Sequence, residues 1–262
     1  MGNGSQYSLI TESPGIGATK EQMERLYQRY HFALSYASGK DVLEVACGTG
    51  IGLSYLALKA RRVVGCDIDE KNLGLAKTYN RSYDGMIWID LMDAHDLSYQ
   101  DESFDLVLLY EAIYYLKEPE QFIKEARRVL RENGTLIICS VNKDWQDFHP
   151  SPYTWKYYSI PELHDLMRKY YRKVSVYGGF HVESFKIRDS VISLIKHLAL
   201  RYHLIPGSLK ARSYLKRIFI GKLMPLPSHI YEGMASYQVP VAIRNDHVNK
   251  DFKIIYYVGQ KD

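Results

Sequence analysis

Acidic residues and glycines follow three consecutive apolar segments of the chain. Glu44 precedes the turn 46–50, where glycine allows backbone N–H groups to come close to a ligand. Asp67 ends the next segment, where a carboxylate can accept hydrogen bonds from both hydroxyls of a ribose. Asp93-Ala94 follows the third segment and is placed to accept from the exocyclic amine of a purine. The pattern predicts a nucleoside ligand bound without a phosphate site.

Strands and helices alternate along the chain, which places these residues at one edge of a sheet. The 262 residues suit a single α/β domain (1–262) with its cofactor-binding core at 41–142. Near-continuous apolar strands alternating with helices predict a doubly wound, seven-stranded, mostly parallel sheet. The strands expected are Asp41–Ala46, Arg62–Asp67, Met86–Ile89, Phe104–Tyr110, Gly134–Val141, Val174–Tyr177 and Phe252–Val258. The helices expected are 18–38, Ile51–Lys59, Glu70–Tyr79, Glu118–Leu130 and Ile160–Tyr170.

Residues 41–138 resemble the class I S-adenosylmethionine-dependent methyltransferase domain in the order and spacing of four motifs. Their forms are V-L-E-V-x-C-G-T-G, V-x-G-x-D, D-A-x-x-L and S-F-D-L-V. The dinucleotide-binding pattern G-x-G-x-x-G is not met, because Leu53 takes the place of its third glycine. Ala46 stands where the family usually has glycine, and we expect it to keep a similar backbone with a negative φ. The matching segments are Val42–Gly50, Val64–Asp67, Asp93-Ala94 and Ser103–Val107.

The resemblance implies S-adenosylmethionine as the cofactor. Glu44 and the turn 48–50 would hold its methionine portion, Asp67 its ribose and Asp93 its adenine amine. Ile68 and Asn72 would flank the adenine. The helix 18–38 would lie over the cofactor. The full cofactor-binding set is Arg29, Tyr30, Glu44, Ala46, Cys47, Gly48, Gly50, Asp67, Ile68, Asn72, Asp93, Ala94 and Tyr110.

The Arg29-Tyr30 pair resembles a motif in methyltransferases of bacterial surface-glycan biosynthesis clusters. That resemblance implies that Arg29 pairs with the cofactor carboxylate, although an ordinary surface ion pair is an equal alternative. It also favours a sugar hydroxyl as the methyl acceptor. The family pattern further implies that the strand 252–258 is inserted antiparallel as the last strand.

The acceptor site is expected in the segments after the fourth and fifth strands, 110–115 and 142–158. Alignment of the acceptor supplies most of the rate of an in-line methyl displacement. A general base adds ~10²–10⁴-fold for a hydroxyl acceptor. The candidates are His149, Glu111 and Asp144, of which the imidazole titrates nearest neutrality. Each residue also has a structural alternative. His149 can be a hydrogen-bonding loop residue, Glu111 can bind the cofactor or the N-terminal helix, and Asp144 can cap a turn.

Aromatic residues crowd the same two segments. They can stack on a sugar, enclose an aromatic acceptor or surround a cationic amine, and about half are expected simply to pack in the core. No N/D-P-P-Y/F motif follows the fourth strand, which argues against DNA adenine as the acceptor. No His/Cys cluster predicts a metal site.

Charge is concentrated in one block of the sequence. The chain carries +4 overall, whereas 186–223 holds nine basic residues and one acid. We expect 185–223 to form a basic helical insertion or lid. Its apolar residues pack on the domain, or the segment contacts a membrane surface or a lipid-linked, anionic acceptor. Three cysteines, without the spacing of a disulfide framework, predict a cytoplasmic protein. If the basic segment contacts a membrane, the protein would lie at the inner face of that membrane.

These features predict a methyltransferase acting on a small-molecule or glycan-like hydroxyl. Three alternatives stay open: a natural-product O- or N-methyltransferase, a non-catalytic cofactor-binding subunit and an RNA-binding methyltransferase. The absence of turnover would identify the non-catalytic subunit. A steep salt dependence of RNA binding would identify the RNA-binding methyltransferase.

Overall fold

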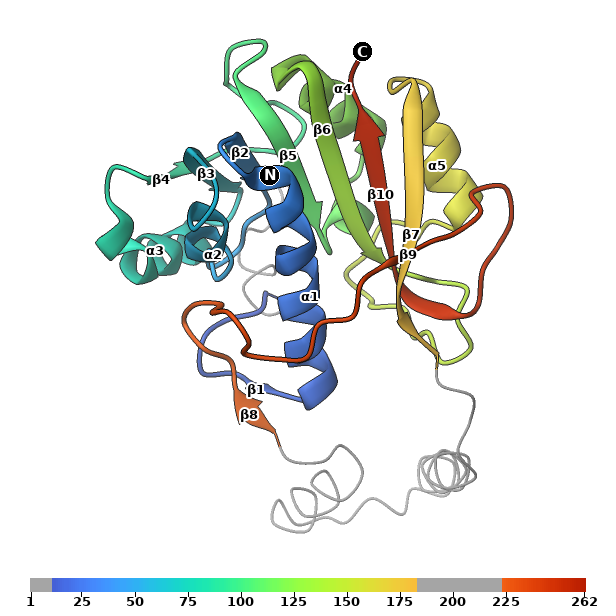
Figure 1. The fold of residues 1–262 in the computed structure, drawn as a ribbon, viewed down its shortest axis with the longest axis horizontal. Helices are drawn as coiled ribbons and strands as arrows, with labels where there is room; N and C mark the ends of the chain where they lie inside the picture. The colour runs from blue at the N-terminus through green and yellow to red at the C-terminus, as the bar shows by residue number, and fades with distance from the viewer. Residues whose placement is uncertain (1–10, 183–222) are drawn as a thin grey trace.

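The computed structural model describes residues 11–182 and 223–262, which build layers of helices on a central sheet (Figure 1). The strand order is β4-β3-β2-β5-β6-β10-β7-β9. Strands β2 to β6 pair in parallel, and β10 runs antiparallel to both β6 and β7. The bounds are β2 Asp41–Val45, β3 Arg62–Asp67, β4 Ile87–Leu91, β5 Phe104–Tyr110, β6 Leu130–Val141, β7 Lys173–His181, β9 Val241–Ala242 and β10 Phe252–Gln260.

The doubly wound, mostly parallel sheet confirms the fold expected from the sequence. The antiparallel last strand, β10, lies between β6 and β7, as the family pattern implied. The expected number of seven strands was one too few for this sheet. The additional strand, β9, is only two residues long and pairs with Tyr177 and Gly178 at the sheet edge. A strand this short leaves no period-two pattern in a sequence.

Within the described part of the chain, five helices flank the sheet. They are α1 Lys20–Ala37, α2 Leu53–Ala57, α3 Glu70–Tyr79, α4 Pro119–Val129 and α5 Ile160–Arg168, with short 3₁₀ turns at Arg81–Tyr83 and Ile113–Tyr115. Thr19 caps α1, accepting a hydrogen bond from the backbone of Gln22 while the Gln22 side chain accepts from Thr19 N. Separately, β1 (Gly17–Ala18) pairs with β8 (Met224–Pro225).

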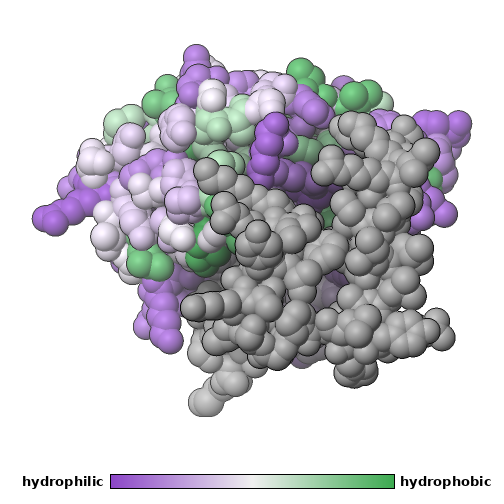
Figure 2. All heavy atoms as spheres, turned by 90° about the horizontal axis from the view of Figure 1, so that it is seen from below, coloured by the Kyte–Doolittle hydropathy of each residue, from purple (hydrophilic) through white to green (hydrophobic). Residues whose placement is uncertain are grey.

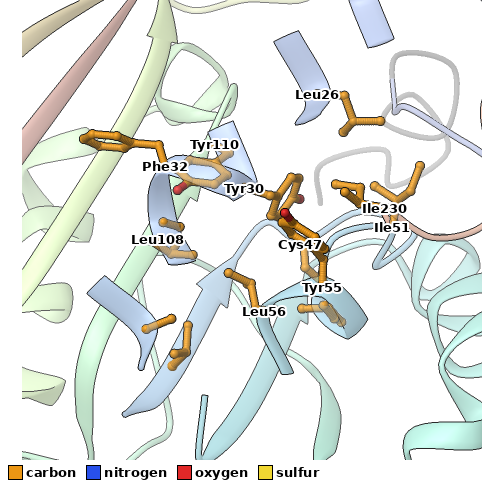
Figure 3. Close-up of a cluster of buried hydrophobic side chains, with 14 of the residues drawn as sticks. Leu26, Tyr30, Phe32, Cys47, Ile51, Tyr55, Leu56, Leu108, Tyr110 and Ile230 are labelled. Carbon is orange, nitrogen blue, oxygen red and sulfur yellow. The ribbon is translucent and has the colours of Figure 1, made fainter. Parts of the chain in front are cut away.

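The core has two halves because successive strand residues point to opposite faces of the sheet. In β5, Leu106, Leu108 and Tyr110 join the cluster under α1 and α2, whereas Val107 and Leu109 join the cluster under α4 and α5. Figure 3 shows the first cluster, where side chains of α1 meet those of α2 and β5. Both faces of the central strands are therefore buried, as their continuous apolar sequences predicted.

Gln28 fixes α1 to the sheet through hydrogen bonds made inside the core. Its Nε2 donates to the carbonyl of Gln238 at 2.6 Å, and the Tyr256 hydroxyl donates to its Oε1 at 3.0 Å. The absence of a side chain at Gly179 makes room, since a Cβ there would lie 2.7 Å from Gln28 Oε1. One face of α1 is thereby held at a defined height above the sheet.

The visible described surface in Figure 2 mixes hydrophilic and hydrophobic residues. Within residues 11–182 and 223–262, no helix combines the length and apolarity that crossing a bilayer requires. The predicted basic insertion at 185–223 lies almost entirely outside the described residues, so its role as a lid or membrane contact stays a prediction.

Replacing Gln28 should destabilise the protein strongly. Gln28→Ala leaves the Tyr256 hydroxyl and the Gln238 carbonyl without their buried partner, so we expect a loss of about 2–4 kcal/mol in the free energy of unfolding, measured by urea titration. Lys20→Ala on the exposed face of α1 is the control and should change it by less than about 0.5 kcal/mol. Equal effects of the two substitutions would contradict the stabilising role of the Gln28 hydrogen bonds.

Candidate active site

A cavity of about 440 Å³ opens at the carboxyl ends of the parallel strands, where doubly wound sheets bind ligands. Its volume lies within the roughly 300–1,000 Å³ of small-ligand sites. The structure brings twelve of the thirteen predicted cofactor residues to its walls: Arg29, Tyr30, Glu44, Ala46, Cys47, Gly48, Asp67, Ile68, Asn72, Asp93, Ala94 and Tyr110.

Gly50 is the exception, because it does not line the cavity. Its φ is +67°, and a Cβ there would lie 2.9 Å from both Ala76 Cβ and Asn80 Nδ2. Gly50 therefore lets the turn pack against α3, and its predicted contact with the cofactor gains no support from the cavity lining.

The turn after β2 is left-handed at three positions. Gly48 and Gly50 have φ of +56° and +67°, and Ala46 has +57°. The expectation of a negative φ at Ala46 was wrong. The chain must reverse sharply at the end of β2, and it does so through the conformation that the family's usual glycine adopts freely but that a Cβ disfavours.

Asp67 connects this turn to the end of β3. Its two carboxylate oxygens accept from Gly48 N and Asp69 N, each at 2.9 Å. The residue is 8% exposed and lines the cavity. Burial raises the pKa of Asp67, and the two backbone N–H donors oppose that shift. The carboxylate is thus held rigidly, with lone pairs remaining for the hydroxyls of a ribose.

Glu44 is the carboxylate that α1 covers. The Tyr30 hydroxyl donates to its Oε1 at 2.5 Å. Burial raises the pKa of Glu44 to about 7, against the opposing effects of this hydrogen bond and of the Arg29 charge. Gly52 allows the Tyr30 ring into this position, since a Cβ at Gly52 would lie 1.9 Å from Tyr30 Cε1.

Arg29, which precedes Tyr30 on α1, is a buried cation that pairs with the carboxylate of Glu12. Glu12 and Glu111 favour the charged guanidinium, so the pKa of Arg29 stays well above its ordinary value despite burial. The sequence carried no signal for Glu12, which approaches α1 from a separate segment.

The cavity fits an α-amino acid group. Within the described residues, Glu44 Oε2 and Arg29 Nε are buried polar atoms without a hydrogen-bond partner. A carboxylate and a guanidinium with unused polar atoms complement the ammonium and the carboxylate of a methionine moiety. Buried polar groups of this kind normally have partners, so a ligand that supplies them suits the site.

A second group of cavity residues suits an adenine. Ile68 is 50% exposed and offers an apolar face beside Asn72. Asp93 Oδ1 accepts from the backbone of His95 at 2.9 Å and lies 2.6 Å from His95 Nδ1. His95 also lines the cavity, and sequence reasoning had passed over it although it directly follows Asp93-Ala94.

Glu111 is the predicted base that the structure does place in the cavity. Its Oε2 accepts from the Tyr114 hydroxyl at 2.8 Å and from Val141 N at 3.2 Å. Burial raises its pKa, with the Arg29 charge opposing the shift. The residue has a φ of +52°, a strained conformation that is typical of functional sites.

The structure does not bring the other two predicted bases to the cavity. His149 is exposed, and its Nδ1 lies 2.9 Å from the carbonyl of Asp147 in its own loop. Asp144 lies in the turn that Asn142 caps and is likewise absent from the cavity walls. The structure therefore gives no support to either residue as the base, and their catalytic role stays a prediction; periodicity cannot reveal the course of the irregular segment after β6.

Aromatic side chains form one wall of the cavity. Tyr115 and Trp155 line the cavity, and the Trp155 ring is 65% exposed. Tyr114 joins them but continues into packing with Tyr157, at a ring distance of 4.8 Å. As expected, part of the aromatic crowding is core and part faces the site. The α1 residues Gln22 and Arg25, which sequence reasoning missed, line the cavity as well.

No group of three or more metal-ligating side chains occurs within residues 11–182 and 223–262.

Residues 43–138 match the family model described as "Methyltransferase domain". Over 138 residues the chain is 30% identical to the methyltransferase GfsG of Streptomyces halstedii, covering 52% of this chain and 50% of that protein. Over 177 residues it is 28% identical to a probable S-adenosylmethionine-dependent methyltransferase of Mycolicibacterium smegmatis, covering 65% and 63%. The chain thus spans about half to two thirds of the length of these relatives.

A solved structure shares the fold along nearly the whole chain. The [4+2]-cyclase SpnF superposes with a TM-score of 0.60 at 18% identity, covering 98% of this chain and 95% of that one. Its name describes a cyclase, so the shared fold does not by itself define the reaction.

Residues 43–138 therefore form a methyltransferase domain of the class I, S-adenosylmethionine-dependent kind. The motifs, the cavity at the carboxyl edge and the relatives agree on this class, and its cofactor is S-adenosylmethionine.

Ala46→Gly should stabilise the protein. Glycine removes the cost of a Cβ in the left-handed region, so we expect a gain of about 1 kcal/mol in the free energy of unfolding by urea titration. Ala57→Gly, in the helix α2, is the matched control and should lose about 1 kcal/mol. A loss at both positions would contradict the strain at Ala46.

Cofactor affinity should fall as the pH drops below about 7. Because the pKa of Glu44 is raised from 4.5 to about 7, its stabilising contribution to the unliganded fold is present at low pH and lost as the pH rises through 7. Cofactor affinity depends on pH in the opposite direction. It rises as the pH rises through 7, because the cofactor ammonium binds the ionised carboxylate of Glu44. Calorimetric titration of S-adenosylhomocysteine should show up to about tenfold weaker binding per pH unit below 7.

Two variants test the assignment of this titration to Glu44. Tyr30→Phe removes a hydrogen bond that lowers the pKa of Glu44 and should move the midpoint to higher pH. Glu44→Gln should flatten the profile. Wild-type affinity that is constant from about pH 5.5 to 8 would be inconsistent with this role.

Proposed function

We propose that this protein transfers a methyl group from S-adenosylmethionine to a hydroxyl of a sugar ring that carries an anionic group, in surface-glycan biosynthesis. The observation that carries the proposal is Glu111, a half-buried carboxylate that lines the same cavity as the predicted cofactor residues and the aromatic wall. When bound, the cofactor supplies an electrophilic methyl group on a sulfonium.

Glu111 takes the proton of the acceptor hydroxyl in this proposal. Its raised pKa makes it a stronger base than an exposed glutamate. The bonds from Tyr114 and Val141 engage Oε2, whereas among residues 11–182 and 223–262 the one hydrogen-bond partner of Oε1 is the Cys139 thiol, 3.9 Å away. Oε1 is therefore the oxygen available to an acceptor. The hydroxyl oxygen gains the methyl group as its O–H bond breaks, and S-adenosylhomocysteine leaves.

The aromatic wall suits a ring-shaped acceptor. The exposed ring of Trp155 is held by its backbone, because Trp155 N donates to the carbonyl of Tyr114 at 2.9 Å. Tyr115 stands beside it, 4.6 Å from the Tyr114 ring. Such faces stack on the C–H side of a sugar and equally on a flat aromatic ring. The aromatic wall alone thus supports both the glycan acceptor and the natural-product alternative.

Arg25 favours the anionic sugar over a neutral phenol. Its Nη2 pairs with the carboxylate of Glu21, and Lys253 Nζ lies 3.0 Å from that same carboxylate. Two cations thus share one anion. Arg25 Nε is buried without a partner among the described residues, and Arg25 lines the cavity that also holds Glu111. A phosphate on the acceptor supplies the missing acceptor atoms and charge.

The proposal predicts a selective loss of turnover in Glu111→Gln. With a methyl-accepting sugar phosphate found by screening, kcat should fall about 10²–10⁴-fold, while the Kd for S-adenosylhomocysteine changes little. Glu125→Gln, outside the cavity, is the charge-matched control. An unchanged kcat in Glu111→Gln would contradict the role as base, and acceptance of phenols but not sugars would favour the natural-product alternative.

Arg25→Gln should act on acceptor binding alone. We expect KM to rise about tenfold or more for a sugar phosphate, because a charge-assisted hydrogen bond is worth about 1.5–3 kcal/mol. The KM for the methyl glycoside of the same sugar and the Kd for S-adenosylhomocysteine should stay within about twofold. Equal effects on the phosphorylated and neutral sugars would rule out Arg25 as the phosphate receptor.

A further inference from the structure

A short segment before β1 lies in the cofactor cavity. Thr11 and Glu12 both line it, together with Glu44 and Asp67. Asn72 Nδ2 donates to Thr11 Oγ1 at 3.0 Å, and Thr49 Oγ1 donates to the carbonyl of Glu12 at 2.9 Å. The segment therefore contacts residues at the predicted adenine and methionine ends.

The segment is anchored on one side. Gly15 N donates to the carbonyl of Leu226 at 2.8 Å, and Leu226 N donates to that of Ile16 at 2.9 Å. The pairing of β1 with β8 continues this anchor. Glu12 therefore stays close to Arg29 as an intrachain carboxylate, with a high effective concentration at that guanidinium.

Glu12 presents to Arg29 the same chemical group as the amino-acid end of the cofactor. Arg29 is 7% exposed, so a second carboxylate brought to it meets the first at close range in a poorly solvated site. Glu12 is more accessible, with 40% of its side chain exposed. It can therefore leave the ion pair for solvent, where water hydrates its carboxylate. Replacement of one carboxylate by the other keeps the buried cation paired throughout.

We propose that Glu12 is an internal competitor for the carboxylate of the cofactor. It pairs with Arg29 when the amino-acid end of the site is empty and must leave when S-adenosylmethionine binds. It thereby weakens the binding of S-adenosylmethionine and of S-adenosylhomocysteine, but not of a nucleoside that lacks the amino-acid group. The inference rests on the proposed function, because it takes Arg29 as the receptor of the cofactor carboxylate.

Two ligands and one substitution test this competition. S-adenosylhomocysteine carries the carboxylate, whereas 5′-methylthioadenosine keeps the adenosine and thioether without it. If Glu12 occupies Arg29 about nine-tenths of the time, Glu12→Gln should bind S-adenosylhomocysteine about tenfold more tightly in calorimetric titrations. The Kd for 5′-methylthioadenosine should stay within about twofold of the wild-type value.

Glu24→Gln controls for the loss of one negative charge, since Glu24 lies on α1 outside the cavity and pairs with Lys20. It should leave both affinities unchanged. In an Arg29→Gln background, Glu12→Gln should also have no effect, because neither carboxylate then has its receptor.

Each other outcome overturns the inference. Equal affinities of wild type and Glu12→Gln for S-adenosylhomocysteine would show that Glu12 does not compete. Weaker binding by Glu12→Gln would show that the segment instead closes over the bound cofactor. A wild-type protein that binds neither ligand would contradict the proposed function itself, and this inference with it.

Discussion

A buried arginine sets the electrostatics of the whole site. Arg29 carries a permanent charge at 7% exposure, and such a charge is stable only beside carboxylates. Glu12 pairs with Arg29 directly. The charge of Arg29 also lowers the pKa values of Glu44 and Glu111, which burial raises. Glu44 and Glu111 are therefore coupled electrostatically through one guanidinium.

The position of that arginine depends on packing some distance away. Gln28, the preceding residue, fixes α1 to β10 through its bond with Tyr256, while Tyr30, the following residue, reaches Glu44. Successive residues of one helix thus serve the core, the cation and the carboxylate. The Tyr30 ring further requires Gly52, because a Cβ there would clash with the ring. The glycine-rich turn therefore also determines where Tyr30 can lie.

Much of this arrangement was predictable from the sequence. Apolar strands alternating with helices predict the doubly wound sheet, and parallel strands necessarily bring Glu44, Asp67 and Asp93 to one edge. The remainder depends on contacts between distant segments. Glu12 reaches Arg29 because β1 pairs with β8, and His149 is turned away by an irregular loop. The left-handed backbone of Ala46 follows from the closure of the turn, which residue type alone did not reveal.

The most direct measurement of the central claim is calorimetric titration of S-adenosylhomocysteine into wild type and Asp67→Asn. Loss of one charge-assisted bond costs about 1.5–3 kcal/mol, so the account predicts saturable wild-type binding that the variant weakens at least about tenfold. Asp84→Asn, an exposed aspartate beyond α3, should bind as the wild type does. Absence of wild-type binding, or equal affinity of wild type and Asp67→Asn, would contradict the cofactor site described above.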